Sequence, residues 1–197
     1  MKKKISILLF LSLVTFTSPS QVKIGDTAPG FKLKNIDNSY VALDHYHSEK
    51  GVILIFTCNH CPYSKLYEDR IVALDTKYKR KGFPVVALNP NNPKTSKEDA
   101  FDKMIIRAED KGFTFPYLVD NVGIYKAYGA TKTPHVYLLE NEESHFTVSY
   151  IGAIDDSPKD AGKVKQAYLA EAIDAILAGN KPRLKETKAI GCSIKPY

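Results

Sequence analysis

Residues 52–63 read Val-Ile-Leu-Ile-Phe-Thr-Cys-Asn-His-Cys-Pro-Tyr, and this stretch decides the fold. Its first five residues are continuously apolar and rich in branched side chains, which is typical of a strand covered on both faces. Apolar residues then recur at helical spacing over residues 63–78, and Gly82 ends that pattern. The stretch therefore predicts a buried strand that leads through a short turn into an amphipathic helix. The turn contains Cys58 and Cys61.

The chain on either side alternates between strand and helix signals, without an internal repeat. Upstream, short apolar alternation predicts a hairpin around Asp37 and Asn38. Downstream, turn residues over 89–96 predict a surface loop. The expected hairpin strands are residues 31–33 and 40–43, and the other expected strands are 83–88, 134–139 and 146–151. The last two strands are expected to turn at Asn141. The expected helices are 97–111 and 164–177, and Gly179 ends the second. This order predicts one three-layer α/β domain.

The N-terminus has the pattern of a secretory signal peptide. Three lysines follow Met1, residues 5–16 are almost entirely apolar, and residues 17–20 are small and polar. The apolar run is shorter than the roughly 20 residues that a membrane-spanning helix needs. We expect cleavage after Ser20, which leaves residues 21–197 as an exported domain, periplasmic or secreted, without stable membrane insertion. A retained membrane anchor is the alternative, although no second apolar segment supports it.

Charge and cysteine content narrow the function further. The 197-residue chain has a formal charge of +6, which falls to +3 once the three lysines of the leader are removed. The remaining basic residues are scattered among acids, so we expect no nucleic-acid partner. All three cysteines lie beyond the leader, and an odd number leaves one thiol without an internal partner in a compartment where disulfides persist.

The predicted redox centre is the Cys58-x-x-Cys61 motif at the start of the helix. Free N–H groups and the dipole at a helix N-terminus stabilise a thiolate, so the first thiol is expected to attack a disulfide and the second to resolve it. Pro62 fits the first helical turn. His60, when charged, would favour the thiolate, and His60 and Asn59 are candidates for tuning the redox potential. This chemistry needs no cofactor. A structural disulfide or half of a zinc site is the alternative, but a second cysteine pair is absent.

Beyond the leader, the chain resembles the thioredoxin-like superfamily, and within it the redoxin branch of alkyl hydroperoxide reductase and thiol-specific antioxidant proteins. The matching segments are Gly-Asp-Thr-Ala-Pro-Gly-Phe-Lys-Leu at 25–33, Phe-Thr-Cys-Asn-His-Cys-Pro-Tyr at 56–63, Ala-Tyr-Gly-Ala-Thr-Lys-Thr-Pro at 127–134 and Gly-Cys-Ser-Ile-Lys at 191–195. The resemblance implies a central mixed sheet flanked by helices and a thiol–disulfide oxidoreductase. Its expected partners are protein or small-molecule thiols and disulfides, together with a redox partner protein.

The resemblance also assigns a substrate groove. It implies a cis bond before Pro134, which packs against the redox pair, while the backbone of Thr133 meets the bound peptide. A cis X-Pro bond is tolerable where a tight turn holds it. A trans proline opening a strand is the alternative.

Two departures from the family pattern bear on activity. Peroxidase members cradle peroxide with threonine or serine and proline before the cysteine, whereas Leu54 and Ile55 stand at the matching places. A peroxiredoxin-like thiol peroxidase is therefore kept only as an alternative. Thioredoxin has a buried carboxylate on the strand before the motif, and this strand has none. Glu68 is the remaining candidate for the proton acceptor of Cys61; the alternative is a solvated helix residue.

Two further residues leave alternatives open. Cys192 is either an auxiliary thiol that folds back to exchange with the Cys58–Cys61 pair or a plain buried cysteine. A copper-binding or copper-delivery protein is the rival function, with Cys58, Cys61 and His135 as ligands, because thiolates and imidazole suit copper. A lone strand histidine is otherwise a core or surface group. The sequence does not indicate whether the pair reduces or oxidises its substrate.

Overall fold

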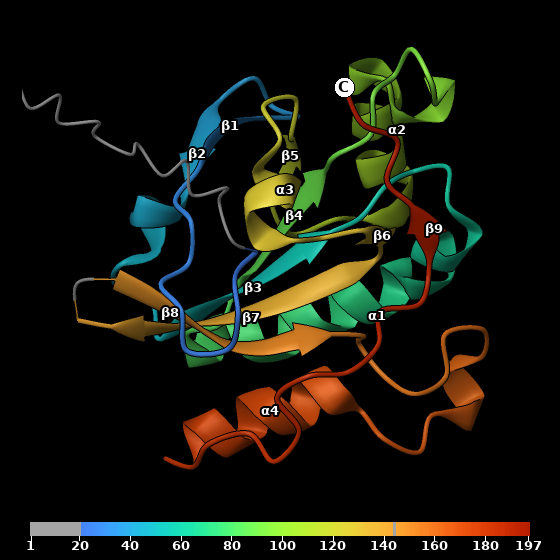
Figure 1. Cartoon of the computed structure of the whole chain (residues 1–197). Coiled ribbons are helices and arrows are strands. Elements are labelled where there is room, and N and C mark those ends of the chain that lie inside the picture. Colours follow the sequence, from blue (N-terminus) through green and yellow to red (C-terminus); the bar gives the residue numbers. More distant parts are fainter. Residues whose placement is uncertain (1–20, 144) are drawn as a thin grey trace, which may run out of the picture.

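The computed structural model describes residues 21–143 and 145–197, so the predicted signal peptide at residues 1–20 lies outside the described part. A seven-stranded sheet forms the centre, in the order β2-β1-β5-β4-β3-β7-β8 (Figure 1). The strands are β1 (Lys32–Asn35), β2 (Tyr40–Ala42), β3 (Gly51–Phe56), β4 (Val85–Asn89), β5 (Tyr117–Val119), β7 (His135–Glu142) and β8 (His145–Gly152). The helices are α1 (Pro62–Tyr78), α2 (Phe101–Lys111), α3 (Ile124–Tyr128) and α4 (Tyr168–Leu177). Among the described residues, no helix has the length and apolar character needed to cross a bilayer.

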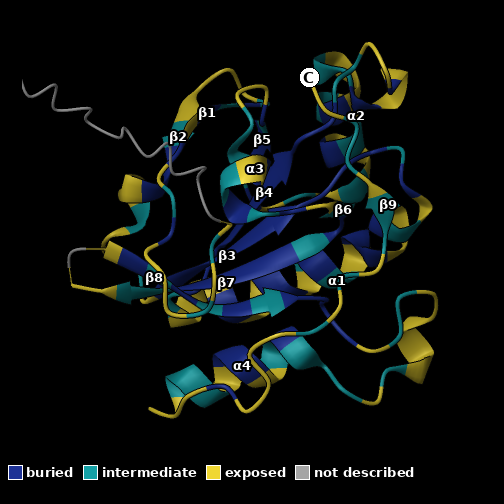
Figure 2. Ribbon diagram, viewed as in Figure 1, coloured by how far each residue is buried: buried dark blue, intermediate teal, exposed yellow. Residues whose placement is uncertain are grey.

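The central strand of the site is β3, which the sequence predicts as buried on both faces. It pairs in parallel with β4 and antiparallel with β7, and all six of its residues are buried. The β4–β5 pair is also parallel, while β1–β2, β1–β5 and β7–β8 are antiparallel. The sheet is therefore mixed, as predicted, and the buried strands β3, β4 and β7 run through its middle (Figure 2).

Alternate residues of β3 supply two separate cores. Ile53 and Ile55 pack in the cluster that contains the apolar residues of α1 and α4. Leu54 and Phe56 point the other way, into the cluster that contains the tyrosines of α3. Because successive side chains of a strand face opposite sides of a sheet, the continuously apolar run is buried from both directions. The predicted three-layer architecture is confirmed.

Two helices begin later than their apolar patterns predict. The pattern over residues 97–111 predicts one helix, but Ala100 is extended, with φ −65° and ψ 150°, and it separates a 3₁₀ turn at Lys97–Asp99 from α2. The pattern over 164–177 likewise begins ahead of α4, because Val164 is extended. In both cases the residues ahead of the helix form a turn with its own polar contacts, Ser96 to Asp99 in one and the Lys165 N–H to Asp156 in the other, although the apolar spacing predicts a helix there.

The hairpins are confirmed with one shifted turn. β1 and β2 pair around a turn in which Asn38 takes a φ of 67°. β7 and β8 continue through Asn141, which pairs with Phe146, so the predicted turn at Asn141 is wrong and the chain turns after Glu142. β5 and α3 have three and five residues, too few to give a period in the sequence.

The C-terminal tail returns to the centre of the molecule. β9 (Cys192–Ser193) pairs antiparallel with β6 (Lys132–Thr133), which directly precedes Pro134. Figure 1 shows β9 lying beside β6, near the end of α1 at which the helix begins. The sequence indicates only loop character for this tail, because a two-residue strand held by its backbone has no side-chain pattern. The pairing brings Cys192 to the predicted redox centre.

Candidate active site

The two cysteines of the motif stand where β3 passes into α1. Thr57 extends the strand by one more backbone bond, from its N–H to the carbonyl of Leu88. Cys61 is the N-cap residue of α1, and Pro62 is the first residue of the helix, where its missing N–H leaves no intrahelical bond unmade. Cys58 is 2% exposed and Cys61 is fully buried.

Thr133 contacts both thiols. Its hydroxyl Oγ1 lies 3.0 Å from Cys58 Sγ, and its carbonyl oxygen lies 3.1 Å from Cys61 Sγ. The Thr133–Pro134 bond is cis, as the resemblance implies. The structure thus brings Cys58 and Cys61 together with Thr133 and Pro134, which the sequence analysis also names and which lie more than 70 positions further along the chain. Thr133 itself is completely buried.

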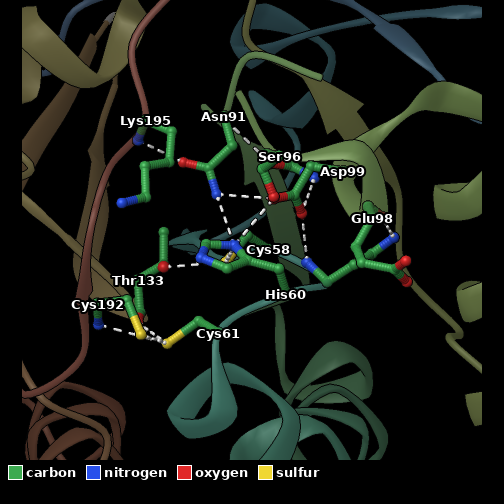
Figure 3. Close-up of polar contacts among 12 residues, drawn as sticks. Cys58, His60, Cys61, Asn91, Ser96, Glu98, Asp99, Thr133, Cys192 and Lys195 are labelled. Carbon is green, nitrogen blue, oxygen red and sulfur yellow. Dashed lines mark hydrogen bonds and ion pairs between the residues drawn. The ribbon is translucent and has the colours of Figure 1, made fainter. Parts of the chain in front are cut away.

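Cys192 adds a third sulfur to this arrangement (Figure 3). The sulfur atoms of Cys192 and Cys61 lie 2.6 Å apart, and the backbone N–H of Cys192 donates to Cys61 Sγ at 3.3 Å. Unlike the other two, Cys192 is partly exposed. The sequence leaves Cys192 as either an auxiliary thiol or a plain buried cysteine, and this geometry matches a thiol that folds back onto the Cys58–Cys61 pair.

The three thiols differ in acidity. A hydrogen bond from the Cys58 thiol lowers the pKa of Cys61 to about 4, helped by the Cys192 thiol and by backbone N–H groups of Ser64 and Cys192. That same bond raises the pKa of Cys58 above its ordinary value, together with burial and the nearby Asp99 carboxylate. Burial, then the bond to Cys61, raises the pKa of Cys192 to about 11.

The sequence places the thiolate on the first cysteine of the motif, and the structure favours the second. Cys61 lies at the positive end of α1 and receives N–H donors, whereas Cys58 faces the Asp99 carboxylate, which disfavours a negative charge on its sulfur. The carbonyl of Thr133 is the acceptor among the neighbours of Cys61, and it opposes the charge there. The donors outnumber it, so Cys61 is the better-stabilised anion.

Asp99 binds both His60, which Figure 3 shows beside it, and Asn59. His60 Nδ1 donates to Asp99 Oδ2 at 3.0 Å and lies 3.6 Å from Cys58 Sγ. The backbone N–H of Asn59 donates to Asp99 Oδ1 at 2.6 Å, and its side-chain oxygen accepts from the hydroxyl of Tyr117. His60 therefore lies beside the pair as predicted, while Asn59 anchors the turn through side-chain bonds to the Glu98 carbonyl and the Tyr117 hydroxyl.

Sequence reasoning missed Asp99, whose side chain is completely buried. Besides His60 and Asn59, it accepts hydrogen bonds from Ser96 Oγ at 2.6 Å, Asn91 Nδ2 at 2.9 Å and Asn89 Nδ2 at 3.1 Å. Burial alone raises the pKa of Asp99, but these bonds together outweigh burial and hold the pKa below its ordinary value. A buried carboxylate thus supports the motif from the loop, not from the strand.

This network also corrects the prediction of a surface loop over residues 89–96. Asn89 and Asn91 are each 1% exposed and Ser96 is 8% exposed, because their side chains turn inward to Asp99. The signal that sequence reasoning lacked is the convergence of five polar residues on the Asp99 carboxylate, three of them from residues 89–96. Turn-forming residues in a loop look the same whether they face water or a buried partner.

Glu68 is neither solvated nor a free base. It is 3% exposed, and its two oxygens accept from Nε and Nη2 of Arg107, each at 2.6 Å. The Lys111 Nζ lies 3.7 Å from Glu68 Oε2. The carboxylate is therefore committed to an ion pair between α1 and α2, and the alternative of a solvated helix residue is wrong.

The alternative sites of the sequence analysis find little geometric support. Within the described residues, Cys58, His60 and Asp99 are the one group of three metal-ligating side chains whose ligand atoms all lie within 4.8 Å of one another. The proposed copper ligand His135 is outside it; the ring packs on Tyr137 at 4.9 Å, and burial lowers its pKa to about 4. Both oxygens of Asp99 already accept hydrogen bonds, which suits positioning better than metal coordination.

The places matching the peroxide cradle are also occupied by core residues. Leu54 and Ile55 are fully buried in β3 and pack in the two apolar clusters. Neither side chain has a hydrogen-bonding group for a peroxide oxygen. The turn at Cys58 therefore lacks the polar cradle that peroxidase members of the family use.

Comparisons with known proteins agree with this geometry. The AhpC/TSA family model matches residues 24–157. The thiol-disulfide oxidoreductase ResA of Geobacillus thermodenitrificans is 30% identical over 129 residues, which cover 64% of this chain and 68% of that protein. The crystal structure of an uncharacterized conserved protein from Geobacillus kaustophilus matches with a TM-score of 0.81 and 36% identity, over 88% of this chain and 92% of that one. A thioredoxin family protein from Chlorobium tepidum shares the fold at a TM-score of 0.54 and 14% identity, over 67% and 87% of the two chains. The thioredoxin-like fold and the redoxin resemblance are confirmed.

Proposed function

The chain belongs to the AhpC/TSA family, a family of redox enzymes, and on this basis we propose that it catalyses thiol–disulfide exchange through Cys58 and Cys61. The observation that carries the proposal is the placing of both thiols at the start of α1 against Thr133, with unequal acidities. A thiolate held beside a protonated thiol is the state from which exchange begins, because the thiolate is the nucleophile and the second thiol supplies the resolving sulfur.

The chemistry balances with the two sulfurs alone. A thiolate of the reduced pair attacks one sulfur of a substrate disulfide, which releases one substrate thiolate and forms a mixed disulfide. The other cysteine then attacks the pair's sulfur in that mixed disulfide, which releases the second substrate thiolate and leaves Cys58–Cys61 oxidised. Two electrons pass to the substrate, whose thiolates take up two protons. The reverse sequence oxidises a substrate dithiol, so the proposed partners are protein or small-molecule thiols and disulfides.

We also propose that the chain is exported and that residues 1–20 are removed. Support comes from the lysines, the short apolar run and the small residues that precede Gln21. N-terminal sequencing of the protein recovered outside the cytoplasm should begin at Gln21. Recovery of the protein only inside the cell with Met1 in place would contradict the proposal.

A redox titration tests the exchange function. The full chain is equilibrated in glutathione buffers of graded ratio, its thiols are trapped by alkylation, and peptides are analysed by mass spectrometry. We expect a two-electron couple that joins Cys58 to Cys61 and disappears in Cys58→Ser and Cys61→Ser. Insulin reduction should follow the same variants, whereas peroxide consumption should be slow because the cradle is missing. A chain without the couple, or with peroxide consumption faster than insulin reduction, would overturn the proposal.

A further inference from the structure

The C-terminal tail, residues 191–195, lies in the place where a substrate strand would bind. Thr133 pairs with Cys192 and Lys132 with Ser193 in an antiparallel ladder, and the N–H of Ile194 donates to the carbonyl of Thr131 at 3.2 Å. The backbone preceding a cis-proline at a redox pair is thus occupied by the chain's own strand. An extended segment that adds to an exposed strand through main-chain bonds is also how many proteins bind peptides.

The far end of the tail is fixed to the loop that supports the motif. The N–H of Lys195 donates to Asn91 Oδ1 at 2.7 Å, and the N–H of Asn92 donates to the carbonyl of Lys195 at 2.7 Å. Asn91 also donates to Asp99, so one asparagine joins the tail to the network around His60. The tail is therefore bonded on both sides of the thiols and not merely laid across them.

Gly191 permits this close approach. A Cβ at this position would lie 2.1 Å from the carbonyl oxygen of Thr133 and 2.6 Å from its carbonyl carbon. Both are backbone atoms of the strand that contacts the thiols, so a side chain has no room unless the tail moves away. The local sequence thus allows the docked position directly beside Cys192.

Docking decides which sulfur meets the solvent. Cys58 and Cys61 are buried and the tail lies against Cys61, whereas Cys192 is partly exposed and its sulfur contacts that of Cys61. An external thiol therefore reaches Cys192 without any movement of the tail. It reaches the pair only after the tail has left the Thr133 strand.

From this geometry we propose that Cys192 is a third catalytic cysteine, the outer member of a relay that connects external thiols to the buried pair through Cys61. The inference rests on the proposed thiol–disulfide exchange and adds the route by which substrates enter it. The tail acts as a built-in substrate strand that presents Cys192 to Cys61, so the external partner is a small-molecule or flexible peptide thiol that attacks at the surface.

Each step of the relay is an exchange between sulfurs. With the pair oxidised, the Cys192 thiolate attacks Cys61, which forms a Cys61–Cys192 disulfide and releases Cys58 as a thiolate. An external thiolate then attacks Cys192, which releases Cys61, and a second external thiolate attacks the resulting mixed disulfide, which releases Cys192. The net change is two external thiols oxidised to a disulfide and Cys58–Cys61 reduced to two thiols. A small-molecule disulfide restores the pair by the reverse steps.

The acidities of the thiols fit these steps. The lowered pKa of Cys61 makes it a good leaving group when an external thiolate attacks Cys192. The bond to Cys61 and its negative charge contribute to the raised pKa of Cys192, and both effects end when Cys61 enters a disulfide. Cys192 is then left with Lys132 and Lys195 nearby, which favour its thiolate. The outer thiol is thus more acidic in the state in which it must attack.

Two variants of the full chain test the relay, with glutathione as the probe. Cys58→Ser, treated with glutathione disulfide, should form an intramolecular Cys61–Cys192 bond, seen by peptide mapping and as a mass two hydrogens lower than that of the reduced variant. Cys192→Ser should keep the Cys58–Cys61 couple but should be reduced by glutathione at least tenfold more slowly in stopped flow. Ile190→Ala is the matched control, since its side chain is exposed just ahead of the docked residues 191–195, and it should react at the wild-type rate.

The outcomes separate the two proposals. An unchanged or faster reaction of Cys192→Ser, or glutathione on Cys61 in place of the Cys61–Cys192 bond in Cys58→Ser, would overturn the relay and leave the tail as a cover. Loss of the Cys58–Cys61 couple from the wild-type chain would overturn the proposed function itself. An intact couple together with slow exchange in Cys192→Ser supports both.

Discussion

Substituting Gly191 with alanine should lift the tail from the redox centre. The added Cβ would lie 2.1 Å from the carbonyl oxygen of Thr133, 2.6 Å from its carbon and 3.1 Å from the nitrogen of Pro134. No flexible side-chain end is among these atoms, so the overlap is relieved only by movement of the backbone. Overpacking of this kind costs about 1–3 kcal/mol. If the cost falls on the docked state, the open state gains about 5- to 150-fold in population.

The assay is the rate at which iodoacetamide alkylates Cys61 in the reduced full chain, followed by peptide mass spectrometry. Because Cys61 is fully buried when the tail is docked, the rate reports opening, and we expect Gly191→Ala to react about 5- to 150-fold faster. Gly30→Ala is the control, since nothing lies within 4 Å of a Cβ there. Hydrogen exchange of β3 should stay slow in both variants, which distinguishes tail opening from global unfolding. Equal alkylation rates in wild type and Gly191→Ala would refute the reasoning.

Three other predictions concern the charges around the thiols. Because the pKa of Cys61 is lowered to about 4, the reduced chain should keep one thiolate at neutral pH, which is measured by its absorbance at 240 nm. The thiolate stabilises the fold fully above the pKa of an unfolded cysteine, and both this stability and the absorbance should be lost as the pH drops through about 4. Cys61→Ser should lack this transition. Asp99→Asn should lower the free energy of unfolding in urea by about 2–4 kcal/mol, because it sets an amide donor against donors such as His60, and a loss below about 1 kcal/mol would contradict the role given to Asp99. Glu68→Gln should cost about 1–3 kcal/mol by leaving Arg107 partly buried without its partner, and a double-mutant cycle with Arg107→Gln that shows no coupling would be evidence against the ion pair.

The fold was predictable from the sequence where one element carries a strong pattern. The apolar run of β3 has a single interpretation, because a strand whose neighbours face both ways cannot lie at a surface. The helical period after it and the Cys58-x-x-Cys61 motif then fix the turn between them. The cis bond before Pro134 was predicted from the family resemblance and not from periodicity, because nothing in the local sequence distinguishes a cis-proline from a trans-proline.

The rest of the site was hidden because its contacts are between distant residues of ordinary type. Asp99 lies 40 positions from Asn59, and its partners Asn91 and Ser96 belong to a loop whose asparagines and prolines indicate a turn. Nothing in the local composition says that such a loop faces inward. Glu68 was misread for the same reason, because the Arg107 that buries it lies on a different helix.

The tail shows how the hidden contacts bear on the chemistry that was predicted. Two of the donors that stabilise the Cys61 thiolate, the thiol and the backbone N–H of Cys192, belong to the tail. By linkage, whatever these two donors contribute to lowering the pKa of Cys61 is lost when Cys61 is protonated, and docking of the tail is weakened by the same free energy. Oxidation of Cys61 removes the charge altogether and with it this part of the attraction. The charge on Cys61 and the position of the tail are consequently coupled: these donors hold the tail to the ionised thiolate, and in the proposed relay a covalent Cys61–Cys192 bond takes their place.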